Sequence, residues 1–275
     1  MTKYAYLLSG SAGHSLSPAM HNAAFGALGL DAHYEALGVT EADLPERVAR
    51  LREDDVYGAN VTIPHKLAVI PLLDALTPEA QRVGAVNTIL NRGGELTGHN
   101  TDVGGFLRAL KDASGYDPES RDVVMLGAGG SARAVGFALL RAGATLGIVN
   151  RTTSKAEALA GALGRYGNVA AVRPDGVISA VQRASLLVNT TSAGHDTHGA
   201  GQLPLPHGIL PREMVVDIIY RPVRTPLLAA AEREGLKTQN GLPMLVYQGA
   251  EALELWTGQD APTEVMFGAL REALE

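Results

Sequence analysis

Apolar and polar positions along this chain follow two periods in turn. Short runs with consecutive or alternating apolar residues predict β-strands, and longer runs with apolar residues three or four apart predict helices. In the first part of the chain the predicted strands are 4–8, 32–37 and 56–63, with two further pieces around the Gly93-Gly94 turn. The helices predicted there are 17–28, 41–52, 66–76 and 78–84, the first with Ser17 as N-cap and Pro18 at the first helical position.

A second unit is predicted to begin after Asp102. It contains a helix at 103–114, a complete strand–helix–strand unit at 121–151, a helix at 155–164, strands at 185–191 and 214–220, and a helix at 225–235. Two more helices, at 242–258 and 262–275, close the chain. Strands that alternate with helices favour an α/β architecture.

The amino-acid composition limits the classes of function that this chain could have. The chain has 275 residues, 46% of them hydrophobic and 19% charged, with a net charge of −6. This balance is typical of a globular protein, and without a basic tract it argues against nucleic acid as a partner. The absence of cysteine excludes thiol nucleophiles and thiolate metal sites. No apolar run reaches the length of a membrane span, so we expect a cytoplasmic protein.

The stretch VVMLGAGGSARAVGFALL lies between a predicted strand and a predicted helix. Gly127, Gly129 and Ala132 form a G-x-G-x-x-A pattern. The first glycine allows a tight turn, the second lets a phosphate approach the backbone, and the small third residue lets helix and strand pack closely. The helix N-terminus also favours an anion. A glycine triplet in this context predicts a dinucleotide-binding loop.

The second strand of that unit ends at Asn150-Arg151-Thr152. An NAD site usually has an acidic residue here for the ribose 2′-hydroxyl. The Arg151 guanidinium can instead make charge-assisted bonds to a 2′-phosphate, although exposed arginines are also common on surfaces. The position favours NADP as the cofactor.

Polar residues gather at the end of the predicted strand 56–63. Asn60 and Thr62 alternate with apolar neighbours, Pro64 ends the strand, and Lys66 follows. Asp102 in GHNTD could face this lysine across a cleft and hold its ammonium. A surface lysine and a helix-capping aspartate explain the same residues, and the spacing alone does not choose between these two readings.

Ser15 and Ser17 in HSLSP lie just before a predicted helix. Two hydroxyls beside a helix N-terminus could hold a carboxylate. A plain capping role for Ser17 fits the spacing equally well.

The segments GANVTIPHK, GAVNT, GHNTD, GAGGSAR, NRT and GLPMLVYQGAEALELW, in this order, resemble the shikimate dehydrogenase family over nearly the whole chain. The resemblance implies an α/β fold with a substrate-binding domain at 1–103, completed by C-terminal helices at 240–275, and a Rossmann-type doubly wound NADP domain at 104–239. It implies reduction of 3-dehydroshikimate to shikimate with NADPH, in the biosynthesis of aromatic amino acids, by a monomer or homodimer.

The resemblance also implies roles for individual residues. Lys66 and Asp102 would be the catalytic pair, whereas His65 would have a local packing role. The substrate would be bound by Ser15, Ser17, Thr62, Asn87, Asp102, Tyr220 and Gln248. The cofactor would be bound by Gly127, Ala128, Gly129, Gly130, Ser131, Asn150, Arg151, Thr152, Thr153, Ser154, Lys155, Thr190, Ile218, Gly241 and Met244.

Other interpretations compete with this one. A quinate dehydrogenase that uses NAD would favour an acid in place of Arg151 and often a threonine in place of Ser17. A non-catalytic NADP-binding protein on the same fold would not need both Lys66 and Asp102. A relative of methylene-tetrahydrofolate dehydrogenase would not explain HSLSP together with NVTIPHK. The histidines His195, His198 and His207 lack the spacing of a metal site, so no metal is expected.

Overall fold

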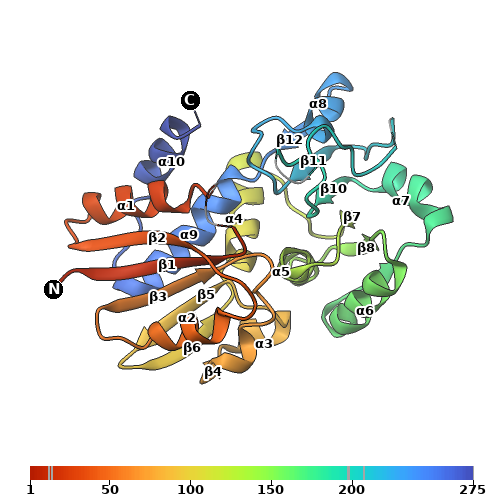
Figure 1. Cartoon of the computed structure of the whole chain (residues 1–275). Helices are drawn as coiled ribbons and strands as arrows, with labels where there is room; N and C mark the ends of the chain where they lie inside the picture. Colours follow the sequence, from red (N-terminus) through yellow and green to blue (C-terminus); the bar gives the residue numbers. More distant parts are fainter. Residues whose placement is uncertain (12, 14, 197–198, 207, 275) are drawn as a thin grey trace. The chain divides into compact units, whose positions relative to one another are not determined.

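Two sheets of six strands organise the chain, each within its own unit. A computed structural model describes residues 1–11, 13, 15–196, 199–206 and 208–274. The first unit comprises Met1–Gly105 and Leu245–Glu275, and the second comprises Phe106–Met244 (Figure 1). Helices α4 (Asp102–Ser114) and α9 (Leu242–Thr257) continue along the chain from one unit into the other.

The sheet of the first unit is mixed, with the strand order β2-β1-β3-β5-β6-β4. Strand β1 is parallel to β2 and β3, β5 is antiparallel to β3 and β6, and β4 is parallel to β6. The strands are β1 (Lys3–Ser9), β2 (Ala32–Gly38), β3 (Val56–Val61), β4 (Ala75–Leu76), β5 (Thr88–Arg92) and β6 (Glu95–His99).

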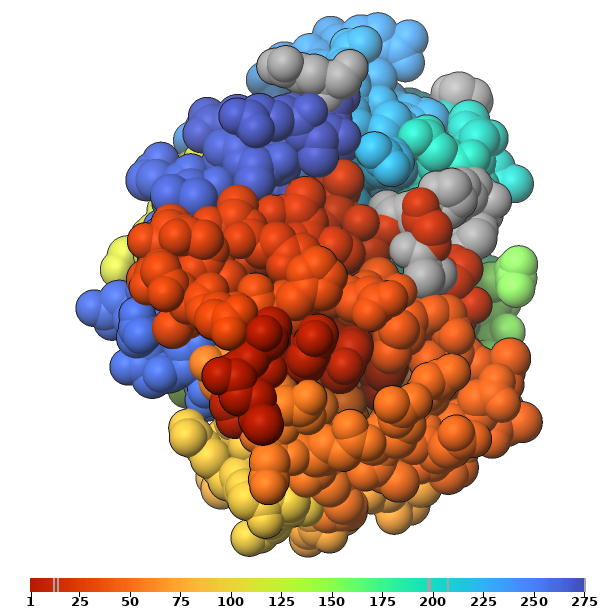
Figure 2. All heavy atoms as spheres, turned by 60° about the vertical axis from the view of Figure 1, so that its left-hand side comes forward, coloured from red at the N-terminus to blue at the C-terminus, as the bar shows by residue number. Residues whose placement is uncertain are grey.

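Helices cover both faces of this sheet (Figure 1). Because strand side chains alternate, Val61 and Ile89 pack toward Val48 of α2, whereas Asn60 and Thr88 point to the opposite face. Helix α10 packs against α1, as Figures 1 and 2 both show. The helices of this unit, besides α9, are α1 (Ser17–Ala27), α2 (Leu44–Arg50), α3 (Pro78–Val83), α10 (Thr263–Glu272) and the 3₁₀ turn η1 (Ile70–Leu72).

The sheet of the second unit is parallel throughout, with the order β12-β11-β10-β7-β8-β9. The order reverses between β7 and β10, which is the switch point where doubly wound folds bind ligands. The strands are β7 (Asp122–Leu126), β8 (Thr145–Val149), β9 (Val169–Ala171), β10 (Leu186–Asn189), β11 (Met214–Asp217) and β12 (Lys237–Gln239). The helices are α5 (Gly130–Arg141), α6 (Thr153–Leu163), α7 (Val177–Arg183) and α8 (Pro226–Arg233), with 3₁₀ turns η2 (Gly164–Tyr166) and η3 (Pro174–Gly176).

Local sequence explains where several helices begin and end. The Thr77 hydroxyl accepts a bond from the Ala80 amide and Pro78 follows the cap, so α3 begins there. Gly84, with φ of 68°, ends the same helix in the left-handed conformation. Thr225 caps α8 in the same way, through the amide of Leu228.

Two expectations about these elements are wrong. The predicted helix at 66–76 is instead the turn η1 followed by the short strand β4, because Pro71 interrupts helical hydrogen bonding and Ala75 pairs with Thr97. Ser17 is the first residue of α1 rather than its N-cap, and the N-cap residue, Leu16, makes no side-chain capping bond. A purely capping role for Ser17 is therefore excluded.

Candidate active site

Lys66 and Asp102 form a buried ion pair in the first unit. Lys66 follows β3 after the Pro64 turn, and Asp102 is the first residue of α4. The Lys66 Nζ lies 2.5 Å from Asp102 Oδ2, and the two residues are 7% and 4% exposed. The backbone carbonyl of Lys66 accepts a bond of 2.8 Å from the Val86 amide, which holds the lysine segment against the start of β5. The structure therefore brings together two charged residues that lie 36 positions apart in the sequence.

Asn87 contacts the other oxygen of the same carboxylate. Its Nδ2 donates to Asp102 Oδ1 at 2.9 Å, and its Oδ1 accepts from the Thr101 backbone amide at 2.7 Å. A backbone amide can only donate, so this second bond fixes which end of the side-chain amide faces Asp102. Asp102 thus accepts one bond from Lys66 and one from Asn87, which is an arrangement suited to an ionised carboxylate.

Gln248 on α9 belongs to the same group of side chains. Its Oε1 accepts from Asn87 Nδ2 at 3.3 Å, while its Nε2 donates to the Leu245 carbonyl at 2.8 Å. A Cβ atom on Gly105 would lie 2.6 Å from the Gln248 backbone nitrogen. Glycine at this position in α4 is what allows Gln248 to come so close.

Glu251 adds a further carboxyl group near this pair. It lies one turn after Gln248 on α9, and a Cβ on Gly104 would approach its Oε2. Burial raises the pKa of Glu251 to about 7, and the negative charges of Glu79, Glu254 and Asp102 act in the same direction. At neutral pH this group therefore carries only part of a negative charge.

The remaining substrate-binding candidates of the first unit lie at loop ends. Ser15 precedes α1, and its Oγ accepts a bond of 3.2 Å from the Ser17 backbone amide. Ser17 is 6% exposed, and Thr62 follows β3 directly, with its amide bonded to the Leu8 carbonyl. His65 is fully buried and its Nε2 lies 2.8 Å from the Val39 carbonyl, which is consistent with the packing role expected for it.

In the second unit, the loops that carry the cofactor-binding candidates lie side by side. They follow the carboxyl ends of the parallel strands, and backbone bonds connect each loop to the next strand end. Gly127 N donates to Val149 O, Thr190 N to Leu126 O, Ile218 N to Asn189 O and Gly241 N to Ile219 O, at 2.8 to 3.1 Å. The structure thus gathers residues from five strand ends along one edge of the sheet.

The glycine loop, residues 127–131, has room for a phosphate group. Gly127 has φ of +113°, and a Cβ there would lie 2.4 Å from Thr190 Oγ1, so the fold itself requires this glycine. Gly129 is different, because a Cβ there would meet nothing within 4 Å and its φ is −87°. The fold does not require glycine at 129, whereas a pyrophosphate placed against the backbone at the start of α5 would. The residues present therefore fit a dinucleotide.

The loop after β8 carries the polar residues expected near the 2′-phosphate. Arg151 and Thr152 are exposed, and the Asn150 Nδ2 donates to the Thr152 carbonyl at 2.9 Å. Thr152 is the N-cap position of α6, so Thr153, Ser154 and Lys155 form its first turn. The N-terminus of α6, which favours an anion, therefore directly follows Arg151 along the chain.

Asp217 at the end of β11 supports the next loop. Its carboxylate accepts bonds from Asn189 Nδ2 at 3.0 Å, Thr225 Oγ1 at 2.7 Å and the Ile219 amide at 3.2 Å. Burial raises the pKa of Asp217 to about 6, although these donors act in the opposite direction. The candidates Ile218 and Tyr220 lie on the loop that this carboxylate holds.

Gly241 and Met244 lie where that loop meets α9. Gly241 directly precedes the helix, and Met244 is in its first turn. A Cβ on Gly241 would clash with the Ile218 carbonyl, so glycine is what lets the two segments approach. The candidates Ile218, Tyr220 and Gly241 therefore come from two adjoining loops, and Met244 comes from the start of α9.

Several residues of this site were missed by the sequence interpretation. Thr88 and Thr101 bond to Asn87, and Asn189 and Asp217 bond to each other. The segments GAVNT and GHNTD contain the first two, so the threonine next to each candidate was the available signal. No comparable signal marks Asn189 or Asp217.

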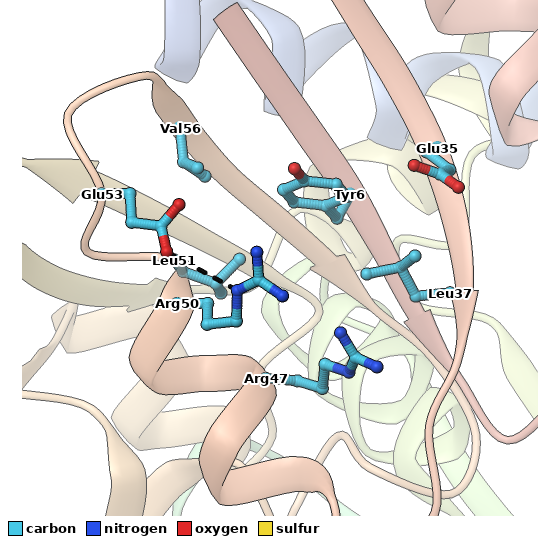
Figure 3. Close-up of a pocket in the computed structure, with 8 residues that line it drawn as sticks. All are labelled: Tyr6, Glu35, Leu37, Arg47, Arg50, Leu51, Glu53 and Val56. Atoms are coloured by element: carbon cyan, nitrogen blue, oxygen red, sulfur yellow. Dashed lines mark ion pairs between the residues drawn. The ribbon is translucent and has the colours of Figure 1, made fainter.

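A pocket lies elsewhere in the first unit, beside α2. It contains charges of both signs, with Arg50 and Glu53 paired at 3.5 Å, and none of the candidate site residues (Figure 3). Its lining is Tyr6, Glu35, Leu37, Arg47, Arg50, Leu51, Glu53 and Val56. It is formed on the α2 face of the sheet, opposite the face that carries Asn60 and Thr88.

The described residues do not form a metal site or a membrane span. Of the three loop histidines, His198 and His207 lie outside the described residues, and the described part of the chain holds no cluster of three or more His, Asp or Glu residues suited to a metal ion. None of the described helices is long and apolar enough to cross a bilayer.

Comparisons with known proteins agree with this geometry. Residues 7–89 match the shikimate dehydrogenase substrate binding domain, residues 109–219 match shikimate / quinate 5-dehydrogenase, and residues 241–271 match the shikimate 5'-dehydrogenase C-terminal domain. The three matches together follow the chain through both units.

Individual relatives cover almost the whole chain. A protein of Moorella thermoacetica named shikimate dehydrogenase (NADP(+)) is 49% identical over 95% of this chain and 90% of its own length. One of the same name from Symbiobacterium thermophilum is 46% identical over 95% and 91%. The crystal structure of shikimate 5-dehydrogenase from Thermus thermophilus, in complex with NADP(H) and shikimate, has a TM-score of 0.90 and 42% identity, covering 99% of this chain and 100% of that one.

Proposed function

Because this chain belongs to the shikimate dehydrogenase family, we propose that Lys66 and Asp102 are the catalytic pair with which it interconverts 3-dehydroshikimate and shikimate, using NADP(H). The observation that carries the assignment of the pair is the direct contact of the two charged groups, both almost fully buried. A charged pair of this kind is costly to bury, and perturbed or buried charges concentrate at functional sites.

The reduction requires a hydride and a proton at the substrate ketone. NADPH, when bound, supplies the hydride to the carbonyl carbon. The oxygen then gains negative charge, which the Lys66 ammonium stabilises before it transfers a proton to that oxygen. Asp102 holds the ammonium in place, and a proton from solvent, taken up and passed on by the Asp102 carboxylate, returns the neutral amine of Lys66 to its charged form. In the oxidation of shikimate the same groups remove the hydroxyl proton.

The other polar residues would orient the substrate. Ser15 and Ser17, at the start of α1, would bind its carboxylate with hydroxyl groups and the positive end of the helix dipole. Thr62, Asn87, Asp102 and Gln248 would bind the ring hydroxyls, and Tyr220 would contact the substrate from its loop after β11. The mutual bonds of Asn87, Asp102 and Gln248 support their place in one subsite.

The edge of the parallel sheet would bind NADP. Residues 127–131 would hold the pyrophosphate, and residues 150–155, with Arg151 as the main cation, would hold the adenosine 2′-phosphate. Ile218, Gly241 and Met244 would lie near the nicotinamide, and Thr190 would lie beside the cofactor. The backbone bonds that connect these loops support one continuous binding edge.

Initial rates test the substrate and the cofactor together. The purified protein is assayed for oxidation of shikimate and of quinate, each with NADP and with NAD. We expect a strong preference for shikimate with NADP. Efficient oxidation of quinate with NAD would overturn the assignment of the substrate and of Arg151, and no oxidation under any condition would overturn a catalytic function.

The domain roles and the cellular setting belong to the same proposal. Residues 1–103 with 240–275 would bind the substrate and residues 104–239 the cofactor, in a cytoplasmic monomer or homodimer. Fractionation of cells and light scattering of the purified protein would test the location and the oligomeric state.

A further inference from the structure

A row of hydrogen bonds runs through the interior of the first unit and ends at Asp102. The Tyr34 hydroxyl lies 2.8 Å from Asn60 Oδ1, and Asn60 Nδ2 lies 3.0 Å from Thr88 Oγ1. The Thr88 hydroxyl in turn lies 3.2 Å from Asn87 Oδ1. Tyr34, Asn60, Thr88 and Asn87 are each at most 5% exposed, so a polar group that loses its partner here loses it in the protein interior, where that loss is costly.

The direction of these bonds is fixed by groups that can only donate or only accept. Asn60 Nδ2 also approaches the backbone carbonyl of Asn87 at 3.4 Å, so its amide nitrogen faces that side and its Oδ1 faces Tyr34. The Tyr34 hydroxyl therefore donates. Thr88 accepts from Asn60, so its own hydrogen points to Asn87 Oδ1 or to the Thr101 hydroxyl 3.1 Å away.

At the other end of the row, the Asn87 side chain bonds to Asp102, so the orientation of its amide determines what the carboxylate of the proposed catalytic pair contacts. Its Oδ1 is held by the Thr101 amide and the Thr88 hydroxyl, so its Nδ2 must face Asp102 Oδ1. The last torsion of an asparagine side chain is broad and nearly two-fold. A turned amide would place its oxygen against the carboxylate, which repels Asp102 from the position where it contacts Lys66.

We propose that Thr88, backed by Asn60 and Tyr34, is a positioning residue of the reaction. Together with the Thr101 backbone amide, its hydroxyl holds Asn87 Oδ1, so that Asn87 Nδ2 faces the carboxylate of Asp102 and positions it against the ammonium of Lys66. This inference rests on the proposed catalytic role of Lys66 and Asp102. In this proposal Asn60 does not contact the substrate. It is buried behind the substrate-binding residues and supports Thr88.

The Tyr34 ring at the far end of the row packs against two other aromatic rings. The His21 ring stacks on the Tyr34 ring with centroids 4.3 Å apart, and Trp256 packs against both. Burial lowers the pKa of His21 to about 3, although its interaction with the Asn60 side chain acts in the opposite direction, so this ring carries no charge at neutral pH. The far end of the row is therefore a packed aromatic cluster.

Three variants test the role of the Thr88 hydroxyl. Thr88→Val keeps the shape and removes the hydroxyl, Thr88→Ser keeps the hydroxyl, and Thr257→Val removes a hydroxyl that bonds within α9. We expect Thr88→Val to lower kcat for shikimate oxidation about 10- to 100-fold. We expect its KM to change much less and the pH profile of kcat/KM to shift. Thr88→Ser and Thr257→Val should retain the kcat and the pH profile of the wild type.

A second pair of measurements tests the row itself. Tyr34→Phe removes the hydroxyl at its far end and should lower kcat about two- to fivefold. In the Thr88→Val background the same change should have no further effect, because the row is already broken. Isothermal titration of shikimate in the absence of cofactor and thermal unfolding accompany each variant, so that loss of binding or of folding is separated from loss of positioning.

Several outcomes would overturn the proposal. A wild-type kcat and pH profile in Thr88→Val would do so, as would an equal loss in Thr88→Ser, since the latter would indicate packing rather than the hydroxyl. If Thr88→Val does not fold, an unchanged kcat in Tyr34→Phe has the same meaning. A failure of the proposed function is distinguishable, because Lys66→Ala would then keep its turnover whatever Thr88 does.

Discussion

Asn189 donates from its side-chain amide to the carboxylate of Asp217 at 3.0 Å, and this bond connects the end of β10 to the end of β11. Both residues are fully buried, and Thr225 bonds the second carboxylate oxygen. An ionisable group in this position makes the stability of the second unit depend on pH.

The first prediction concerns the sign of that dependence. Burial raises the pKa of Asp217 from 3.8 to about 6 in the folded chain. Between these values the folded state holds a proton that the unfolded state has released. The Asp217 contribution to the free energy of unfolding therefore falls as the pH rises through this window, by about 3 kcal/mol. Above the folded-state pKa this contribution is constant.

Asp217→Asn removes this titration while keeping the shape of the side chain. Denaturant unfolding of the wild type and the variant is measured from about pH 4 to about pH 7, and we expect the wild type to lose stability relative to the variant across this range. Asp175→Asn serves as the control, since that side chain is 80% exposed. Parallel pH curves for the wild type and Asp217→Asn would contradict the prediction.

The two glycines of the cofactor loop are predicted to differ. Gly127→Ala forces a left-handed backbone and a clash with Thr190, so we expect a loss of about 1–3 kcal/mol in the free energy of unfolding. Gly129→Ala meets no protein atom and should keep the melting temperature. It should still weaken NADP binding by about 1–3 kcal/mol, because its methyl group occupies space meant for the pyrophosphate. Thermal unfolding and titration with NADP separate the two effects, and unchanged NADP affinity in Gly129→Ala would place the pyrophosphate elsewhere.

Arg151 is predicted to discriminate between the two dinucleotides. A charge-assisted bond to the 2′-phosphate is worth about 1.5–3 kcal/mol, so Arg151→Ala should weaken NADPH binding roughly 10- to 100-fold. NADH lacks that phosphate, and its affinity should hardly change. Arg183→Ala, an exposed arginine at the end of α7, is the matched control. Equal losses for NADPH and NADH would exclude the proposed contact.

The substitution Asp102→Asn is predicted to disrupt the ion pair with Lys66 while keeping a side chain of the same size at this position. An amide has one acceptor oxygen, whereas Asp102 accepts from both Lys66 and Asn87, so one of these donors must face another donor. We expect kcat to fall about 10²- to 10⁴-fold, as for loss of an acid–base group. Asp112→Asn, farther along the same helix and partly exposed, should keep its kcat. Equal turnover in the two variants would remove Asp102 from the mechanism.

Much of this architecture could be predicted because it depends on local patterns. The glycine loop lies between a strand and a helix whose apolar patterns are strong, and the alternation of elements follows from the same periodicity. The strands β9 and β12 have three residues each, which is too short for a period to show. The helix expected at 66–76 fails because Pro71 acts within the run and because pairing with β6 stabilises Ala75 in a strand.

The spacing of residues in the sequence did not show whether Lys66 and Asp102, the proposed catalytic pair, contact each other. It allowed either a pair or a surface lysine with a helix-capping aspartate, and the fold brings the two residues into contact across 36 positions. The row of hydrogen bonds from Tyr34 to Thr88 could not be predicted for the same reason. Its Tyr34–Asn60 bond joins residues 26 positions apart, and its Asn60–Thr88 bond joins residues 28 positions apart. Long-range hydrogen bonds depend on the tertiary structure, and the local periodicity of apolar residues does not determine which distant segments meet.

The most direct test of the account is the turnover of Lys66→Ala. Loss of the ammonium removes both the charge that stabilises the developing oxyanion and the proton donor, so kcat for shikimate oxidation with NADP should fall about 10²- to 10⁴-fold. Titration should give a shikimate affinity close to that of the wild type, and added methylamine should restore part of the turnover. Near-normal turnover in the folded variant would contradict the role assigned to Lys66 and, with it, the catalytic pair.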